Sequence, residues 1–363
     1  MRYFGLIRSF GRAGLVLSAL VAGPVLANDA QTKVAELKTF RDWMVGCDNI
    51  RSCTAIGLPP GREASGYVVV ERDGAGGAST QVSLVVRTED AIKSPIELSI
   101  LIDGEPVLGM PQASYPAGVD KNDINTARLE LPAEDAANLV RQIQDRKELN
   151  LKVTGPGRAP AESTISLTGA PAAFLYMDVD QFRAGTVTAL AGSGWAAAST
   201  VPHVPHVPVL KPVLMRDVKD LPATLPAGVA PNLDDCTDHP PKPDLIRLSP
   251  QLELWGMCYV SAAYNLLRRY WIVDRGQVKE ASFIVPGRKP RADGPAVLVN
   301  AELAQSGRVL ESFALGRGLG DCGTHTMWVW TGTEFQLAFL AEMTDCRGVP
   351  VADWPVMHTS QWK

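Results

Sequence analysis

The chain has 363 residues, of which 35 are basic and 39 acidic, and 46% of its residues are hydrophobic. This composition is typical of a globular protein, and the length exceeds what one hydrophobic core usually serves, so two domains are expected. The excess of acidic over basic residues gives a negative net charge, which disfavours nucleic acid and anionic lipid as partners.

The first 27 residues have the layout of a secretory signal peptide. Arg2, Arg8 and Arg12 precede an apolar run, GLVLSALVAGPVLA, which ends at Ala27. The run is shorter than the roughly 20 residues that cross a bilayer, and no second long apolar segment follows, so no membrane span is expected after signal removal. We therefore predict export to the periplasm with cleavage after Ala27. The soluble mature protein would keep 32 basic and 39 acidic residues, a formal charge of −7.

Residues 28–196 are expected to form an antiparallel, β-rich, sandwich-like domain. After a short helical lead at 30–40, segments rich in β-branched residues alternate with Gly- and Asp-containing turns. A helix is predicted at 132–149, where apolar residues recur at helical spacing behind Pro132, and a second, shorter helix at 170–182. The expected strands are 67–73, 80–88, 96–108, 149–155 and 163–169.

Residues 197–243 differ in character from the rest of the chain. Pro recurs there without apolar periodicity, which is typical of an extended, semi-rigid linker. His203 and His206 could ligate one metal ion, but two imidazoles without a third ligand are weak support, and no metal or cofactor is predicted. Two acidic pairs are interpreted as solvated surface rather than as acid–base catalysts: Asp178 with Asp180, and Asp234 with Asp235.

Residues 244–363 are expected to form a smaller α+β domain, which makes the whole chain α+β. A helix is predicted at 258–270 and a strand at 281–286. The clearest hairpin is HTMWVWTGTEFQLAFLAEM, with its turn at Thr331 and Gly332.

The stretch GRGLGDCGTH, residues 316–325, is the most distinctive of this domain. Its glycines match G-x-G-x-x-G by letter, but a strand follows where a dinucleotide site needs a helix. The structural interpretation is a tight backbone path with positive φ angles, fixed by hydrogen bonds between Arg317 and Asp321. The candidate binding surface consists of this loop, with Arg317 and Asp321, together with the neighbouring Trp328 and Trp330. These two alternate on one strand and so share a face, and a buried aromatic core is the more common interpretation of such a pair.

One arrangement would support catalysis. Cys258 at a helix start, with His325 downstream as base, resembles the order of papain-like thiol hydrolases acting on peptide or amide bonds. Asp321 or Asn265 could orient the imidazole. The even number of cysteines, the predicted export and the absence of characteristic flanking residues argue against this function. Cys322 is a weaker nucleophile candidate because it lies between glycines ahead of a strand.

Six cysteines in an oxidising compartment favour three disulfides. Cys47 and Cys53 are close in sequence and far from the others, which favours pairing them and leaves the pairing of the remaining four open. The six are Cys47, Cys53, Cys236, Cys258, Cys322 and Cys346.

Several strings resemble the bacterial domain-of-unknown-function family 1176, described as exported proteins with six cysteines and no assigned function. They include FRDWMVGCDNIRSCTA, LTGAPAAFLYMDVDQFRAGT, GRGLGDCG and WVWTGTEF. The resemblance covers nearly all of the mature chain and implies no particular enzymatic reaction. It implies that Cys258 and Cys322 belong to a shared disulfide framework, with Cys322–Cys346 as the first choice, Cys236–Cys258 as the remaining pair, and Cys258–Cys322 as the competing pairing.

The string WMVGCD also resembles the opening of the invasion-associated locus B family of exported β-rich proteins. This second resemblance covers only the amino-terminal domain and implies a β-sandwich closed by Cys47–Cys53. Together, these features predict a non-catalytic envelope protein that binds an unidentified ligand or partner protein. The alternative is a thiol hydrolase that uses Cys258 and His325.

Overall fold

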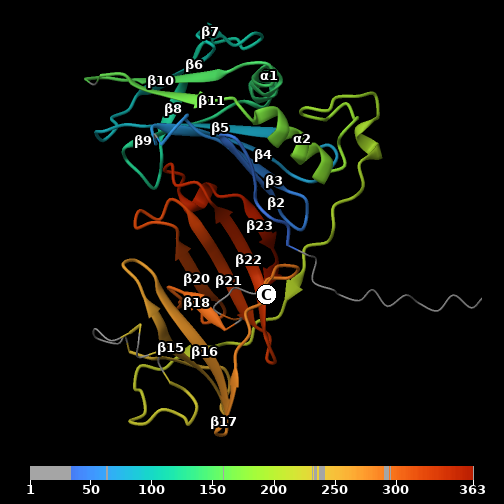
Figure 1. The fold of residues 1–363 in the computed structure, drawn as a ribbon. Helices are drawn as coiled ribbons and strands as arrows, with labels where there is room; N and C mark the ends of the chain where they lie inside the picture. The colour runs from blue at the N-terminus through green and yellow to red at the C-terminus, as the bar shows by residue number, and fades with distance from the viewer. Residues whose placement is uncertain are drawn as a thin grey trace, which may run out of the picture. The chain divides into compact units, whose positions relative to one another are not determined.

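Most of the regular secondary structure of the protein, described here from a computed structural model, consists of antiparallel β-strands (Figure 1). The structure describes residues 34–62, 64–157, 159–230, 232, 235–236, 242–289, 294 and 296–362. The predicted signal peptide with its cleavage site, and Asp234 of one acidic pair, lie outside the described residues. No helix of the described chain is long and apolar enough to cross a membrane.

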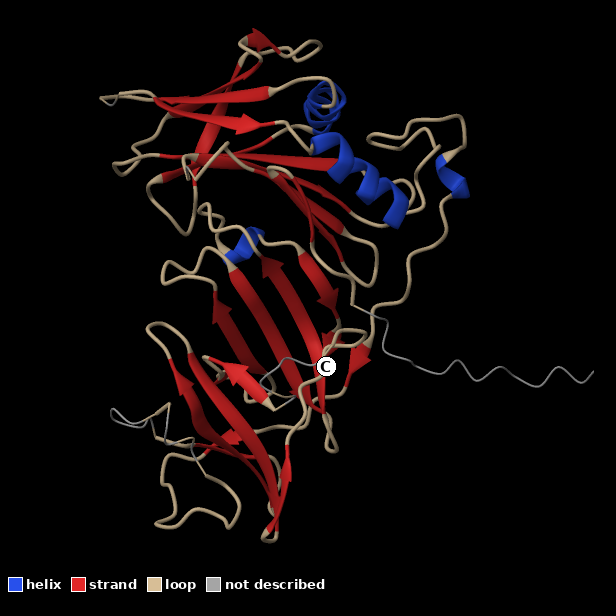
Figure 2. Ribbon diagram, in the orientation of Figure 1, coloured by secondary structure: helices blue, strands red, loops and turns tan. Residues whose placement is uncertain are grey.

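The amino-terminal half of the chain forms one 11-stranded sheet with two helices (Figure 2). The strand order is β1-β2-β3-β4-β5-β9-β8-β6-β10-β11, and β7 pairs with β6. The helices are α1 (Ala133–Ile143) and α2 (Ala170–Asp180). α2 lies at its predicted position, whereas α1 ends six residues before the predicted end at 149, and residues 148 and 149 belong to β10 instead. The strands are β1 (Lys38–Phe40), β2 (Trp43–Cys47), β3 (Cys53–Gly57), β4 (Gly66–Arg72), β5 (Thr80–Arg87), β6 (Ile96–Ile102), β7 (Glu105–Pro106), β8 (Ser114–Val119), β9 (Thr126–Glu130), β10 (Glu148–Thr154) and β11 (Ala161–Ser166).

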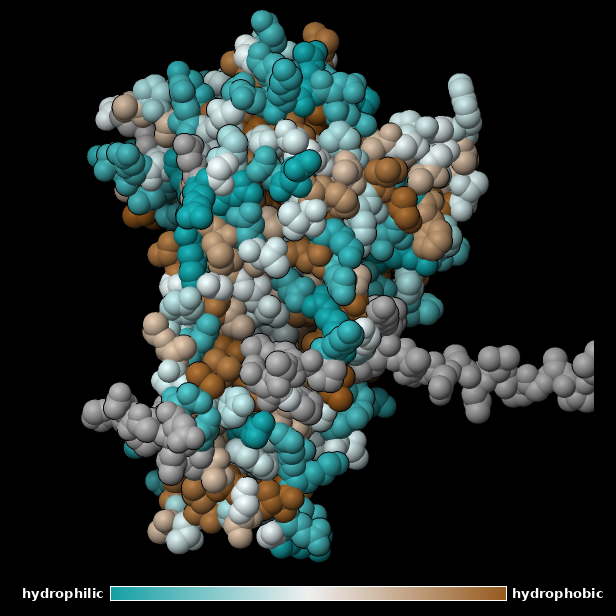
Figure 3. Space-filling view, in the orientation of Figure 1, coloured by the Kyte–Doolittle hydropathy of each residue, from teal (hydrophilic) through white to brown (hydrophobic). Residues whose placement is uncertain are grey.

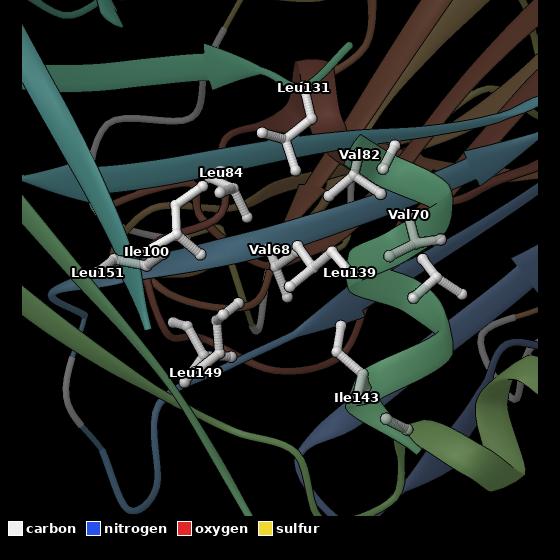
Figure 4. Close-up of a cluster of buried hydrophobic side chains, with 14 of the residues drawn as sticks. Val68, Val70, Val82, Leu84, Ile100, Leu131, Leu139, Ile143, Leu149 and Leu151 are labelled. Atoms are coloured by element: carbon white, nitrogen blue, oxygen red, sulfur yellow. The ribbon is translucent and has the colours of Figure 1, made fainter. Parts of the chain in front are cut away.

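The first core lies between the inner face of this sheet and α1 (Figure 4). Alternation puts Val68 and Val70 of β4 on one face, and the apolar stripe of α1, including Leu139 and Ile143, meets them. Buried residues of β6 and β10 belong to the same cluster, so strands from both parts of the sheet share one core. Each large aliphatic side chain buried here contributes about 1.5–3 kcal/mol.

The carboxy-terminal part contains three sheets. Their orders are β13-β14-β15-β16-β17 with β18 paired to β16, then β19-β20-β21-β22-β23, and a parallel pair, β12-β24. The bounds are β12 (Val209–Leu210), β13 (Arg216–Asp217), β14 (Asp244–Arg247), β15 (Leu252–Ser261), β16 (Leu266–Asp274), β17 (Gln277–Glu280), β18 (Val297–Val299), β19 (Glu302–Leu303), β20 (Leu310–Leu315), β21 (Gly323–Trp330), β22 (Phe335–Met343), β23 (Val356–Thr359) and β24 (Gln361–Trp362).

Three local predictions are wrong. The expected helix at 258–270 is instead the end of β15, a turn and the start of β16. The expected strand at 281–286 has no regular secondary structure, and the described part of the helical lead ends in β1. Both α-helices of the described chain therefore belong to the amino-terminal half, and 244–362 contributes strands and one 3₁₀ turn, Val351–Asp353. For the whole chain, the β-rich α+β class is confirmed.

The outer face of β2–β5 packs against β22 and the segment that follows it. Tyr67 on this face donates a hydrogen bond of 2.5 Å to the carboxylate of Asp353, which also pairs with Arg128. Segment 197–243 contributes β12 and β13, which pair with β24 and β14. The shared cluster contains Met44, Ile56, Leu58, Tyr67, Val69, Val85, Cys322, Ala341, Met343, Val349 and Trp354.

Candidate functional site

A cavity of about 310 Å³ lies between strands of the two larger carboxy-terminal sheets. β18 and residues 283–289 line one side of it, and β20, β21 and β22 line the other. β18 and β20 are in contact, and Figure 1 places them next to each other. This volume is at the lower end of the range of ligand pockets, about 300–1,000 Å³.

The strand register builds one wall of the cavity. Ser312 of β20 lies opposite Thr326 of β21, and Ala314 lies opposite Thr324. Because alternate residues of a strand share a face, Thr324, Thr326 and Trp328 all project to this side of β21. The wall therefore combines hydroxyl groups with the edge of one buried aromatic ring.

The floor of the cavity is apolar. Phe283 and Trp328 are buried and make an edge-to-face contact with ring centroids 5.4 Å apart. Val297 and Leu340 extend this surface from β18 and β22. The indole N–H of Trp328 donates a hydrogen bond of 3.0 Å to the Thr326 hydroxyl, so its polar atom is satisfied inside the protein.

The polar groups of the cavity connect its two sides. The Ser312 hydroxyl accepts the N–H of Val299 at 3.1 Å and donates to the Val299 carbonyl at 2.9 Å, which joins β20 to β18. Arg288 forms an ion pair with Glu342 of β22 and donates to the Ala35 carbonyl at 2.5 Å. Lys289 follows on the exposed side.

The glycine loop has the internal hydrogen bonds that were predicted. Arg317 Nε donates to Asp321 at 2.7 Å, and the same carboxylate accepts the Gly348 N–H at 2.7 Å. Burial alone would raise the pKa of Asp321, but these hydrogen bonds outweigh burial and hold the pKa below its usual value. Gly320 and Gly323 have positive φ angles, whereas the other two glycines of the loop do not. The Asp321 carboxylate thus stabilises the loop through hydrogen bonds inside the protein.

The two Trp residues share a face, as predicted, but they are buried rather than exposed beside the glycine loop. Trp328 and Trp330 are each 2% exposed, and both belong to the core that includes Phe283 and Phe335. Neither Trp side chain is therefore exposed beside the glycine loop. Trp328 nevertheless lines the cavity.

All six cysteines are bonded in three disulfides. The pairs are Cys47–Cys53, Cys236–Cys258 and Cys322–Cys346, the set that the family resemblance placed first.

The thiol-hydrolase alternative is contradicted at Cys258. Its sulfur is bonded to Cys236, and the residue lies within β15 instead of at the start of a helix. A disulfide sulfur is no thiolate nucleophile, and no helix amino terminus is present at this position to lower a thiol pKa.

His325 lies on the opposite face of β21 from the cavity wall. Its ring contacts Phe313 and Phe339, and its Nε2 lies 3.8 Å from the Glu311 carboxylate. Burial lowers the pKa of His325, and the Glu311 charge opposes this only in part. Asn265, the other candidate orienting group, instead bonds the backbone of Leu315 through both its amide N–H and its carbonyl.

The residues considered as metal ligands or acid–base catalysts do not form such sites among the described residues. His203 and His206 are exposed. Within the described residues, one group of three potential metal ligands lies within 4.8 Å, Cys47, Cys53 and Asp180, and its two sulfurs are bonded to each other. The interpretation of Asp178 as solvated surface is wrong, because its side chain is fully buried against Arg72.

An apolar surface over α2 and the following segment was not singled out from the sequence. Hydrophobic side chains are visible in this region among polar ones (Figure 3). Trp195 is 98% exposed, in the small-residue stretch AGSGWAAAS. Large exposed apolar patches are typical of interaction sites. The exposed residues are Leu175, Val179, Phe182, Val187 and Trp195.

The cavity was also missed from the sequence, although one signal was present. The alternation Thr324, Thr326, Trp328 places hydroxyl groups beside an aromatic ring on one face. That pattern differs from a purely apolar core strand and could have marked the wall of a polar-lined site.

Comparisons with known proteins identify relatives over most of the chain. It is 27% identical over 347 residues to the uncharacterized protein YpfG of Escherichia coli strain K12, an alignment that covers 88% of this chain and 92% of that protein. The crystal structure of invasion associated protein B from Bartonella henselae is similar with a TM-score of 0.29 and 16% identity, over 41% of this chain and 99% of that one. The family described as "Protein of unknown function (DUF1176)" matches residues 37–361, so the chain belongs to that family.

Proposed function

We propose that the protein is exported and acts in the cell envelope as a non-catalytic binding protein, with the cavity between β18 and β20–β22 as its binding site. The observation that carries this proposal is the cavity itself. It joins a buried apolar floor to a few convergent polar groups, which is the usual composition of a small-molecule site.

The disulfides support the exported location. Disulfides persist in oxidising compartments such as the periplasm and are rare in reducing ones. Every cysteine of the chain is bonded. The amino-terminal signal layout predicted from the sequence agrees with this location.

The arrangement of polar groups supports binding rather than catalysis. The Ser312 hydroxyl is bonded in both directions to Val299, and the Thr326 hydroxyl accepts the Trp328 N–H. Glu342 is paired with Arg288. An activated nucleophile needs an adjacent base within hydrogen-bond reach, and these hydroxyl groups are paired with backbone or indole groups instead.

A neutral apolar probe tests the site. We expect 1-octanol at submillimolar concentration to raise the thermal unfolding midpoint of the full chain purified from the periplasm, because a ligand of the native state stabilises it. In the Ala314→Phe variant the larger side chain fills the cavity, so this increase is expected to be lost. Ala263→Phe, at an exposed turn position, is the matched control and should respond like the wild type.

If Ala314→Phe does not fold, Thr324→Phe, at a half-buried position of the same wall, replaces it. An equal response of the wild type and the cavity-filling variant would show that octanol binds elsewhere, and the proposed site would be wrong.

A further inference from the structure

We infer that the cavity takes a small amphipathic anion, a monocarboxylate with an apolar chain of about eight carbons. This inference rests on the proposed function, that the cavity is a binding site. The chain would lie against the accessible apolar side chains of the lining, among them Ile284, Val285 and Ala314, and the carboxylate would meet the cationic groups at Arg288 and Lys289.

Among the described residues that line the cavity, the charged side chains leave one positive charge without a compensating negative one. Arg288, Lys289 and Glu342 line it. The Glu342 carboxylate accepts a hydrogen bond from Arg288 in an ion pair that is less than one-fifth exposed on each side. Lys289 has no ion-pair or hydrogen-bond partner among the residues that the structure describes. An anion is therefore the ligand charge that this site favours.

Arg288 retains hydrogen-bonding capacity for such an anion. A guanidinium carries five N–H donors. In this protein one terminal nitrogen of Arg288 donates to Glu342 and the other to the Ala35 carbonyl, while Nε is buried with no partner in the described chain. A carboxylate ligand would form charge-assisted hydrogen bonds, which are stronger than neutral ones.

The volume gives the size of ligand that the cavity would hold. One water-sized group occupies about 30 Å³, so a cavity of about 310 Å³ holds roughly ten heavy atoms. Octanoate has this size, whereas the chains of membrane lipids are longer. The apolar lining residues Ile284, Val285 and Ala314 are exposed or half-buried, and they give the chain an apolar contact that a sugar or a small dicarboxylate would not use.

Calorimetric titration with three probes of one chain length separates charge from size. We expect octanoate to bind the wild-type protein at pH 7 about fivefold more tightly than 1-octanol, since a partly exposed ion pair contributes up to about 1 kcal/mol. Octylammonium should bind most weakly because Lys289 repels it. Lys289→Gln should remove the preference for octanoate over 1-octanol.

Lys279→Gln is the matched control, because this exposed lysine lies on β17 and does not line the cavity. Equal affinities for octanoate and octanol in the wild type, or an unchanged preference in Lys289→Gln, would overturn the inference. The proposed function would then still stand if octanol binding is lost in Ala314→Phe. No binding of any of the three probes would refute both.

Discussion

At the scale of single residues, a buried ion pair fixes the segment after α2. Arg72 of β4 donates to Asp178 at 2.7 Å, and neither side chain is more than 1% exposed. The carboxylate also accepts the N–H groups of Leu190 at 2.9 Å and Ala191 at 2.8 Å. The string LTGAPAAFLYMDVDQFRAGT, which carries the family resemblance, therefore includes a residue whose role in the structure is to join a helix, a strand and a loop.

Asp178→Asn is expected to lower the free energy of unfolding by about 3–5 kcal/mol, because it leaves the buried Arg72 guanidinium without its counter-charge. Urea denaturation measures this loss. Asp180→Asn is the control on the same helix. Burial raises the pKa of Asp180, so removing its charge should leave stability unchanged or increase it. Equal losses in the two variants would contradict this account of the ion pair.

At the scale of secondary-structure elements, the start of β21 depends on one glycine. Gly323 has a φ of +142°, and a Cβ atom at this position would lie 2.0 Å from the Ala314 carbonyl oxygen. Gly318, in the same loop, has no positive φ, and the nearest atom to its added Cβ would be a Tyr264 ring carbon at 3.7 Å. Since Ala314 and β21 also line the cavity, this close approach of β20 and β21 helps to define its wall.

Gly323→Ala should therefore lower the unfolding free energy by more than about 2 kcal/mol, in line with the costs of overpacking and backbone strain. Gly318→Ala is expected to stay within about 0.5 kcal/mol of the wild type. Chemical denaturation of both variants measures the difference. A small effect at Gly323 would mean that β20 and β21 can separate without cost.

Elements that depend on local spacing could be predicted from the sequence. The apolar stripe of α1 and the hairpin around Thr331 have periods of 3.6 and 2, and both occur as expected. The helix predicted at 258–270 was wrong because the turn in this segment, AAYN, contains no Gly or Pro to mark it. That turn is held by Asn265, which bonds Leu315 in a distant strand. A contact 50 residues away leaves no local signal.

At the scale of the whole molecule, the candidate site combines parts that are separate in the sequence. The shared face of Trp328 and Trp330 was predictable from alternation, but the opposite wall comes from β18 and the irregular segment 283–289. Which strands face each other across two sheets is decided by tertiary packing, so the cavity and its Lys289 charge could not be derived from local patterns. The even number of cysteines, by contrast, indicated three disulfides, whereas the pairing of Cys236, Cys258, Cys322 and Cys346 came only from the family resemblance.

We propose a fully disulfide-bonded, exported binding protein without a reactive thiol. The most direct measurement is a free-thiol count by mass spectrometry on protein purified from the periplasm, with alkylation before and after reduction. We predict no alkylation before reduction and six added groups after it, two for each disulfide. One or two reactive thiols without reduction, with Cys258 among them, would contradict this proposal and favour the thiol-hydrolase alternative.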